Sequence, residues 1–344
     1  MARPKRSAPT MHQVAALAGV SQATVSLVLN GSNRSRYTDE TRARVLAAVE
    51  ELDYRTNVYA KVLREGVAGV VGFIGDSVAS SPFAGQLVSA AQEAAWDHGL
   101  MLMSVNTDGK GAIESAAVDT LRSYSAVGIV YAFMYHHEIR VPDALRNVPT
   151  VVLNSRDRDS VTHSVFPDER QGGYAATRRL IDAGHRRIAM INIERLASGQ
   201  PAAVGRHQGY LDALAEAGIA PDPALLIEGL GGPTHGYDAI EPLLALADRP
   251  TAIFCANDRT AWGAYQALQA HGVRVPDDIS IIGFDNQEII ATGLHPQLTS
   301  VELPFVVMAK RAIDVLADPA AYSLDQPIAC PIIERSSIVN RPRP

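Results

Sequence analysis

Short hydrogen-bonding side chains gather in one segment near the N-terminus, Ser21-Gln-Ala-Thr-Val-Ser26. Gln22, Thr24 and Ser26 stand there beside apolar residues, as on a helix with one buried side. Side chains of this kind can hydrogen-bond to base edges or to phosphates in the major groove of DNA. The segment therefore predicts a DNA contact, and the alternative is an ordinary helix in a packed pair.

Two short helices around a tight turn would position these side chains. Thr10 can cap the first helix, with Gln13 three residues later as in a capping box. Gly19 permits a sharp exit, and Ser21 can cap the second helix. The expected apolar faces are Val14, Ala15 and Ala18 on the first helix and Val25, Val28 and Leu29 on the second. This pattern is a helix-turn-helix.

A third helix and a weaker helical segment follow. Thr38 can cap the third helix, and Asp39 and Glu40 lie in its first turn, where the helix dipole favours anions. Its expected buried stripe is Val45, Leu46, Val49 and Leu52. Residues 54–66 form a short candidate helix that is marginal alone in water. A head of roughly 50 residues is small for independent stability, so we expect it to depend on a partner or on DNA.

Composition and charge fit a globular protein with a basic head. The chain has 344 residues, of which 47% are hydrophobic and 20% charged, enough for two or three domains. Residues 1–65 hold ten Lys and Arg against six Asp and Glu, while the rest of the chain holds 21 against 31. The net charge of −6 therefore combines a mildly basic head with an acidic body, a distribution that favours DNA binding by the head.

Other chemistries find little support in the residues. Cys255 and Cys330 do not make a disulfide framework, and no Cys/His spacing resembles a metal site. We expect His136-His137 to be a solvated loop pair and Cys255 to be buried rather than nucleophilic. The glycine-rich stretches lack the spacing of a dinucleotide or phosphate loop. Because the sequence has neither a signal core nor a membrane-length apolar run, we expect a cytoplasmic protein. Because it has no catalytic, phosphate-loop or metal motif, we expect a protein that is not an enzyme and holds no cofactor or metal.

From Gly69 onward, short apolar strands alternate with amphipathic helices. The expected strands are Val70–Ile74, Leu100–Val105, Val127–Tyr131, Thr150–Leu153, Arg187–Ile191, Ala224–Ile227, Ala252–Cys255 and Ile279–Phe284. The expected helices are Gly85–His98, Gly172–Ala183, Val204–Ala217, Gly236–Ala247 and Thr260–His271. Such alternation predicts parallel sheets covered on both faces, and the number of strands favours two α/β subdomains. A ligand would then bind beyond the carboxyl ends of the strands, in a cleft between the subdomains.

Head, weak helix and double α/β body, in that order, resemble the LacI/GalR family of bacterial transcriptional regulators. In the head, the resemblance lies in Val14-Ala-Ala-Leu-Ala-Gly-Val-Ser-Gln-Ala-Thr-Val-Ser26, Val28-Leu-Asn30 and Leu52-Asp-Tyr-Arg-Thr-Asn57. In the body, it includes Ser81-Pro-Phe83, Asn106-Thr-Asp108, Gly184-His185, Gly205-Arg206 with Gly209-Tyr210, Cys255-Ala-Asn-Asp258 and Ile282-Gly-Phe-Asp285. The family implies a dimer on operator DNA and a body that looks like a periplasmic sugar-binding protein and senses a small effector.

The resemblance also implies a fold and a division of the chain. The fold is a small all-α helix-turn-helix head joined to an α/β body of two doubly wound parallel-sheet subdomains. Residues 1–55 form the DNA-binding domain, 56–67 the hinge helix, and 68–344 the effector-binding and dimerisation domain. Within the body, we expect an N-subdomain at about 68–166 and 294–322 and a C-subdomain at about 167–293 and 323–340.

By the same resemblance, residues 22–29 are the recognition helix. Gln22 and Ala23 fall where members of the family read bases, since Gln can pair with adenine and Ala can touch a thymine methyl group. Ser21, Thr24 and Ser26 are expected to hold phosphates. Asn30 either contacts DNA or caps the helix. Leu27 departs from the arginine that many members carry, which puts a guanine-based half-site in doubt.

Residues 57–65 match the hinge helix of the family, which folds in the minor groove of the operator. Leu63 matches the leucine that wedges a central base step, and its alternative is burial against the body. Asn57 and Ala60 lie on the same face, and Tyr54 is a further expected DNA contact. Thr56 replaces the usual proline, which leaves the entry to the hinge more flexible.

Arg206 and Asp285 are the leading candidates for effector contacts in the cleft. Arg206 follows a loop at the start of a helix, where its guanidinium can bind sugar hydroxyls or a carboxylate. Asp285 ends a strand, where its carboxylate can accept hydrogen bonds from two hydroxyl groups. A surface ion pair for Arg206 and a turn cap for Asp285 are the structural alternatives.

Five further residues are weaker candidates for the same cleft. Asn257 follows a strand end and can contact the effector, while Asp258 can contact it or only cap the next helix. Phe83 can stack on a sugar ring or pack in the core. Asn154 and Asp76 are polar residues near strand ends, or simply loop residues.

Together these features predict a homodimeric repressor that reads an inverted-repeat operator and releases it when a sugar binds. A purine-type corepressor is the variant hypothesis. A sugar-binding module without DNA function and an α/β enzyme are the other classes that we considered. The sequence does not assign the effector or the operator.

Overall fold

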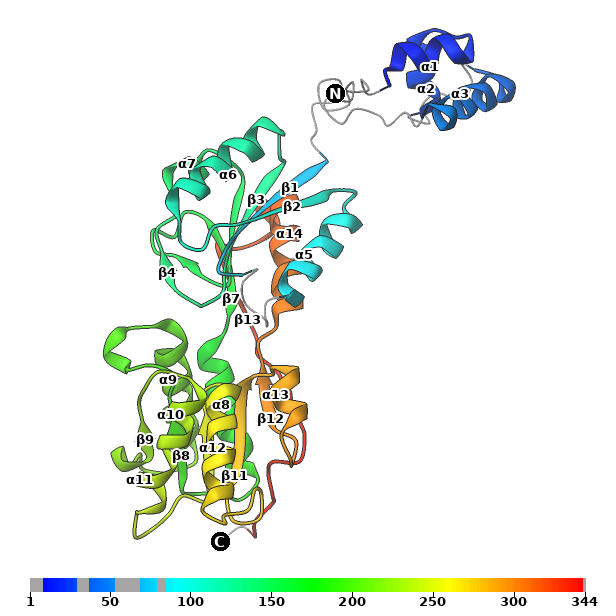
Figure 1. Ribbon diagram of the computed structural model, residues 1–344. Coiled ribbons are helices and arrows are strands. Elements are labelled where there is room, and N and C mark those ends of the chain that lie inside the picture. The colour runs from blue at the N-terminus through cyan, green and yellow to red at the C-terminus, as the bar shows by residue number, and fades with distance from the viewer. Residues whose placement is uncertain (1–8, 30–36, 53–68, 79–84, 343–344) are drawn as a thin grey trace, which may run out of the picture. The chain divides into compact units, whose positions relative to one another are not determined.

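The computed structural model of the chain describes residues 9–29, 37–52, 69–78 and 85–342. The chain divides into two units, Met1–Gly69 and Val70–Pro344, which we call the head and the body. Each is described below by itself (Figure 1).

The described residues of the head form three helices, α1 (Met11–Ala18), α2 (Gln22–Leu29) and α3 (Asp39–Glu51). The predicted capping box is present, because Thr10 accepts a bond from the Gln13 N–H and its own N–H donates to the Gln13 side chain at 2.8 Å. Gly19 ends α1 in the left-handed region, with φ +67°, and α1 and α2 meet at 98°. The predicted helix-turn-helix is therefore confirmed.

One small core holds the three helices of the head together. Its buried members are Val14, Ala15, Ala18, Val25, Val28, Val45 and Ala48. The expectation for Leu46 was wrong, since that side chain is 43% exposed. One residue advances a helix by about 100°, so the position next to Val45 turns away while Ala48, one turn on, faces the core.

Two six-stranded sheets form the body. The sheet of the N-subdomain contains, in spatial order, β13 (Asp325–Ile328), β7 (His163–Pro167), β5 (Thr150–Leu153), β3 (Gly128–Phe133), β1 (Val70–Asp76) and β2 (Met101–Asn106). The sheet of the C-subdomain contains β14 (Ile332–Ile333), β12 (Thr299–Glu302), β11 (Ser280–Asp285), β10 (Ala252–Cys255), β8 (Ile188–Ile191) and β9 (Leu226–Ile227). All pairings are parallel among these described strands except that of β12 with β14. A separate short pair joins β4 (Glu138–Ile139) to β6 (Arg156–Asp157).

Helices cover both faces of each sheet, as the doubly wound prediction requires (Figure 1). On the N-subdomain, α5 (Gly85–Asp97) and α14 (Phe305–Ala317) pack over one face, and α6 (Gly111–Ser123) and α7 (Asp143–Arg146) over the other. On the C-subdomain, α8 (Glu169–Asp182) and α9 (Pro201–Glu216) cover one face. The other face carries α10 (Pro233–Asp238), α11 (Ile240–Leu244) and α12 (Asp258–Ala270), and α13 (Glu288–Gly293) follows β11.

The chain crosses between the subdomains three times, after β7, after β12 and after β13. Our expected boundaries differ from this at the last two crossings. β12 pairs with β11 in the C-subdomain, and β13 pairs with β7 in the N-subdomain. A strand belongs to the sheet that contains its pairing partner. The sequence pattern of short strands such as β12 and β13 does not show which strand is that partner, so it could not assign them to a sheet.

Two expected elements are also shorter than predicted. Helix Gly236–Ala247 is broken into α10 and α11 around Ala239. Pro242 lacks the N–H that a continuous helix needs and its ring crowds the preceding turn, which explains the break. Strand Ala224–Ile227 is reduced to β9 after a 3₁₀ turn at Pro223–Leu225.

Among the described residues, no single helix is long and apolar enough to cross a membrane. Helices α1 and α2 pass that test together as a bent pair, by length and composition alone.

Candidate functional site

The N-terminal end of α2 presents the expected DNA-reading residues. Ser21, Gln22 and Ala23 are exposed, while Thr24 and Ser26 are half-buried. Ser21 Oγ accepts a hydrogen bond from the Thr24 N–H at 3.1 Å, so it caps α2 as predicted. Gln22 Nε2 lies 3.2 Å from His12 Nδ1 on α1, a residue that sequence reasoning had not singled out. The exposed end of α2 is therefore free of covering structure within the described head.

The other expected DNA contacts, Asn30, Tyr54, Asn57, Ala60 and Leu63, lie outside the described residues. The same holds for Phe83.

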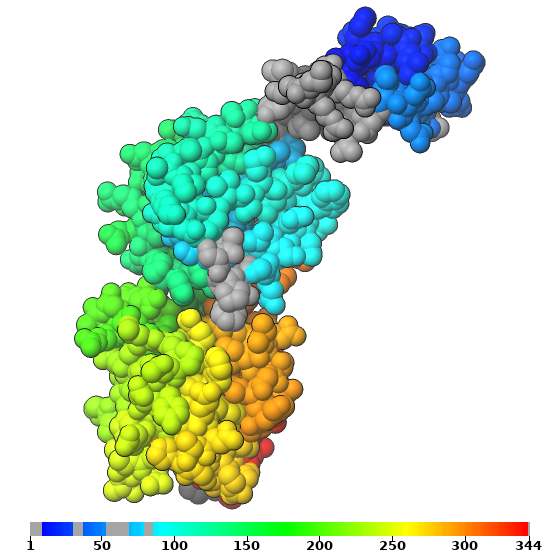
Figure 2. Space-filling view, in the orientation of Figure 1, coloured from blue at the N-terminus to red at the C-terminus, as the bar shows by residue number. Residues whose placement is uncertain are grey.

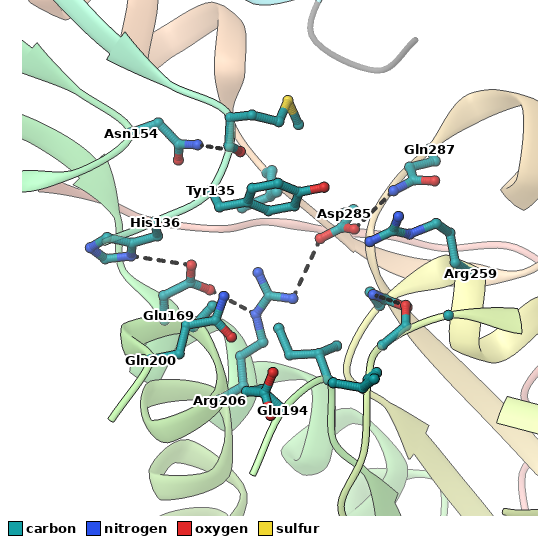
Figure 3. A pocket seen from close by; sticks show the side chains of 18 of the residues that line it. Tyr135, His136, Asn154, Glu169, Glu194, Gln200, Arg206, Arg259, Asp285 and Gln287 are labelled. Atoms are coloured by element: carbon teal, nitrogen blue, oxygen red, sulfur yellow. Dashed lines mark hydrogen bonds and ion pairs between the residues drawn. The ribbon is translucent and has the colours of Figure 1, made fainter. Parts of the chain in front are cut away.

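The body contains a polar cavity of about 590 Å³ between its two subdomains (Figure 3). In the space-filling view, the two subdomains form separate lobes that meet at a junction (Figure 2). The N-subdomain contributes Ser77, Tyr135, His136 and Asn154, among others. The C-subdomain contributes Glu169, Arg206, Asn257, Arg259, Asp285 and Gln287.

Close packing of α8 on α9 positions Arg206. A Cβ at Gly173 would lie 2.2 Å from the Arg206 backbone oxygen, so only glycine lets the helices approach this closely. The approach places Arg206 Nε 2.8 Å from Glu169 Oε2 at the start of α8. Both side chains are buried, at 4% and 5% exposure.

Arg206 has further partners on its other sides. Its Nη1 donates to the Ala256 carbonyl oxygen and lies 3.4 Å from Asp285 Oδ1. Its guanidinium carbon stands 3.7 Å above the centre of the Phe284 ring. Burial lowers the pKa of Arg206, but Glu169 and Asp285 more than offset that effect, so the guanidinium stays charged. Arg206 is thus a buried cation held between two carboxylates.

Asp285 ends β11 in a strained conformation, with φ +99°. Its Oδ2 accepts a hydrogen bond from Gln287 Nε2 at 3.0 Å. Burial raises the pKa of Asp285 to about 6, with Arg206 opposing that rise and Glu169 adding to it. Arg206 and Asp285, which were each predicted to lie in the cleft, line the same cavity.

Asn257 and Asn154 line the cavity but use their amides within the protein. Asn257 caps α12, accepting from the Thr260 N–H at 2.8 Å and donating to the Gly231 oxygen at 2.8 Å. Asn154 sits at φ +58° and donates to the backbone oxygens of Phe133 and Met134. Both residues therefore contribute mainly to the shape of the cavity wall, because their amide groups already bond within the protein.

Asp258 and Asp76 are not among the residues that line the cavity. Asp258 is fully buried behind the wall, where its oxygens accept from Ser300 Oγ and from the Gln287 N–H. The suggestion that Asp258 caps the helix was wrong, since Asn257 is the cap. Asp76 accepts from its neighbour Ser77, and Ser77 is the residue that reaches the cavity.

The wall residues that sequence reasoning missed include His136, Glu169, Arg259 and Gln287. His136 is buried and bonded, so the expectation of a solvated His136-His137 pair was wrong for this residue. Arg259 Nε and Gln287 Oε1 are buried atoms without a hydrogen-bond partner in the described part of the chain. Such atoms are costly unless something bonds to them, so both side chains are candidates for ligand contact.

Cys255 is buried, as expected, and burial raises the pKa of its thiol. Within the ranges that the structure describes, no group of three or more His, Cys, Asp or Glu could hold a metal ion.

A helix-turn-helix head and a two-subdomain body around a polar cavity define a ligand-responsive DNA-binding regulator. Residues 10–57 match the family described as bacterial regulatory proteins, lacI family. Residues 68–329 match the periplasmic binding proteins and sugar binding domain of the LacI family. The chain therefore belongs to the LacI family of transcriptional regulators, whose members are not enzymes.

Named relatives and solved structures agree with this assignment. The chain is 33% identical to the transcriptional repressor PurR of Erwinia tasmaniensis, over 97% of this chain and 98% of that protein. It is 34% identical to the regulator GalR of Escherichia coli, over 97% and 96%. The lac repressor dimer bound to operator and the anti-inducer ONPF superimposes with a TM-score of 0.80, at 26% identity over 97% of this chain and 100% of that one. A CelR–cellobiose complex gives 0.63, at 28% identity over 96% and 99%.

Proposed function

We propose that this regulator represses transcription as a homodimer and releases its operator when an uncharged sugar enters the cavity of the body. The observation that carries the proposal is the buried Arg206, which already has Glu169 and Asp285 as partners. A cation with two carboxylate neighbours offers little net attraction to a phosphate or a carboxylate. It can still donate to hydroxyl oxygens, while Asp285 accepts from hydroxyl hydrogens.

The atoms without partners in the wall support the same ligand class. Gln287 Oε1 needs a donor and Arg259 Nε needs an acceptor, and these buried atoms meet a ligand when their side chains turn toward the cavity. A hydroxyl group both donates and accepts, so a ring with several hydroxyls suits such a wall. Tyr135 is 51% exposed and its ring reaches into the cavity, where it can cover an apolar ring face (Figure 3).

A purine corepressor is the second candidate. The similarity to PurR favours it, and Tyr135 could stack on a purine as readily as on a sugar. In that case ligand binding would strengthen operator binding instead of weakening it.

Thermal unfolding of the full chain separates the two candidates. The panel contains D-galactose, D-ribose, cellobiose, guanine and hypoxanthine. A bound ligand raises the unfolding temperature because it stabilises the folded state by RT ln(1 + [L]/Kd). We expect one sugar to raise it in the wild type and not in Asp285→Asn. A rise with a purine and none with any sugar would contradict the sugar proposal.

The proposal for the head assigns base reading to Gln22 and Ala23 and phosphate contacts to Ser21, Thr24 and Ser26. It extends to Asn30 and to a hinge contact through Tyr54, Asn57, Ala60 and Leu63. Gln22→Ala should lose about 1–3 kcal/mol of discrimination at one base pair. Ser21→Ala should weaken binding to all DNA alike. Gel shifts on the DNA upstream of the gene and on single-base variants measure both, and equal loss on every variant for Gln22→Ala would rule out base reading.

A further inference from the structure

One side-chain pair joins the two subdomains across the cavity. His136 lies in the loop between β3 and β4 of the N-subdomain, and Glu169 opens α8 of the C-subdomain. His136 Nδ1 and Glu169 Oε1 are 3.3 Å apart, and the side chains are 8% and 5% exposed. Apart from the crossover segments, this is the only hydrogen bond between side chains of the two subdomains in the described ranges.

The chemistry of the pair fixes which atom donates. Burial raises the pKa of Glu169, but Arg206 and His136 outweigh burial and bring it below its ordinary value. An ionised carboxylate has no proton to give, so His136 Nδ1–H is the donor. The imidazole also packs on the Phe166 ring, at 5.4 Å between centres, which holds it in this orientation.

Glu169 divides its two oxygens between the subdomains. Oε1 accepts a hydrogen bond from His136 Nδ1–H, and Oε2 accepts one from Arg206 Nε–H at 2.8 Å. Arg206 in turn contacts Asp285, so a continuous chain of four side chains runs from His136 in the N-subdomain to Asp285 in the C-subdomain (Figure 3). A ligand that moves the Arg206 side chain must therefore change the hydrogen bond between Arg206 and Glu169.

We propose that the His136–Glu169 pair couples occupancy of the cavity to the relative position of the two subdomains. This inference rests on the proposed function, since it describes how that ligand is sensed. The backbone connects the two subdomains through three crossovers. The 3.3 Å contact exists only while the β3–β4 loop lies against the start of α8, so the pair favours that arrangement of the subdomains. A ligand that pulls Arg206 from Glu169 shifts that preference, and a differential interaction of this kind is what coupling requires.

Two substitutions at one position separate the hydrogen bond from packing. His136→Phe keeps an aromatic ring against Phe166 and removes the donor. His136→Asn keeps an N–H near the position of Nδ1. Circular dichroism and thermal unfolding check that both fold, and Glu169→Gln, which weakens the same bond from the other side, replaces His136→Phe should that variant not fold.

The first measurement needs no ligand. Fluorophores are attached at Asp119→Cys on α6 and Glu241→Cys on α11, which are both exposed, whereas Cys255 and Cys330 are buried. Single-molecule energy transfer is recorded on full-length protein diluted into unlabelled chain, so that each dimer carries one labelled protomer. We expect His136→Phe to broaden or shift the distance distribution and His136→Asn to match the wild type. An unchanged distribution in His136→Phe overturns the proposal, whatever any ligand does.

The second measurement uses whichever of D-galactose, D-ribose or cellobiose stabilises the wild type. In His136→Phe, the ratio of operator Kd with and without that sugar should fall by about fivefold or more. The sugar Kd, measured by calorimetry, should change less than this ratio. An undiminished ratio contradicts the inference. If no sugar acts on the wild type, the proposed function fails and the ligand-free measurement alone decides the role of the pair.

Discussion

The two subdomains of the body have the same strand order but different chemistry at the cavity. In each sheet, the second strand along the chain, β2 or β9, lies at one edge next to the first strand, β1 or β8. The later strands follow in chain order on the other side of the first strand, ending with β13 or β14 at the opposite edge. The C-subdomain brings Glu169, Arg206, Arg259 and Asp285 to the carboxyl ends of its strands. The described N-subdomain lines its side with neutral side chains and His136.

This difference indicates that the two subdomains, although similar in fold, have different roles at the cavity. Arg206 and Asp285 form the part of the wall with the strongest capacity for polar ligands. The N-subdomain instead fixes its loops with amide and hydroxyl bonds to backbone, as Asn154 and Ser155 do. Substitutions on the two sides should therefore differ in size and in their dependence on pH.

The largest expected effect is that of Arg206→Met. It leaves Glu169 and Asp285 buried without their cation, which should lower the free energy of unfolding by about 3–5 kcal/mol. The matched control is Arg156→Met in the N-subdomain, which breaks an ion pair of 2.6 Å with Asp325. Arg156 is 40% exposed, so its loss should cost at most about 1 kcal/mol. Urea unfolding measures both, and equal losses would contradict the distinction between the subdomains.

The next effect depends on pH. The folded protein keeps the proton of Asp285 up to about pH 6, whereas an unfolded chain releases it near pH 4. Stability from this group is therefore full below pH 4 and is lost as the pH rises to 6, a loss on the order of 2–3 kcal/mol. Asp285→Asn does not titrate, so the wild type should lose stability relative to it over that range. A difference between their urea unfolding energies that stays constant from pH 4 to 7 would refute the raised pKa.

The features that sequence predicted correctly depend on neighbours close in the chain. Thr10 and Gln13, or Ser21 and Thr24, are three residues apart, so one helical turn brings each pair together. Arg206 was predicted from its family motif. The alternation of strands and helices along the chain predicted the two parallel sheets.

The features that sequence missed depend on partners far away in the chain. Glu169 contacts His136 and Arg206, which lie 33 and 37 residues from it, and neither spacing has a local signature. A histidine in a loop is ordinarily solvated, but His136 is buried and contacts Phe166 and Glu169, which lie far from it in the sequence. For the same reason, sheet membership of β12 and β13 followed pairing that no local pattern encodes.

The smallest expected effect tests the neutral side of the cavity. Asn154→Ala removes the bonds to the oxygens of Phe133 and Met134 and forces alanine into φ +58°. We expect a loss of about 1–3 kcal/mol in urea unfolding, without the pH dependence of Asp285→Asn. Asn154→Gly loses the same bonds but accepts the positive φ, so it should be less destabilising than alanine. If glycine proves as costly as alanine, the backbone there carries no strain and the hydrogen bonds alone hold the loop beside His136.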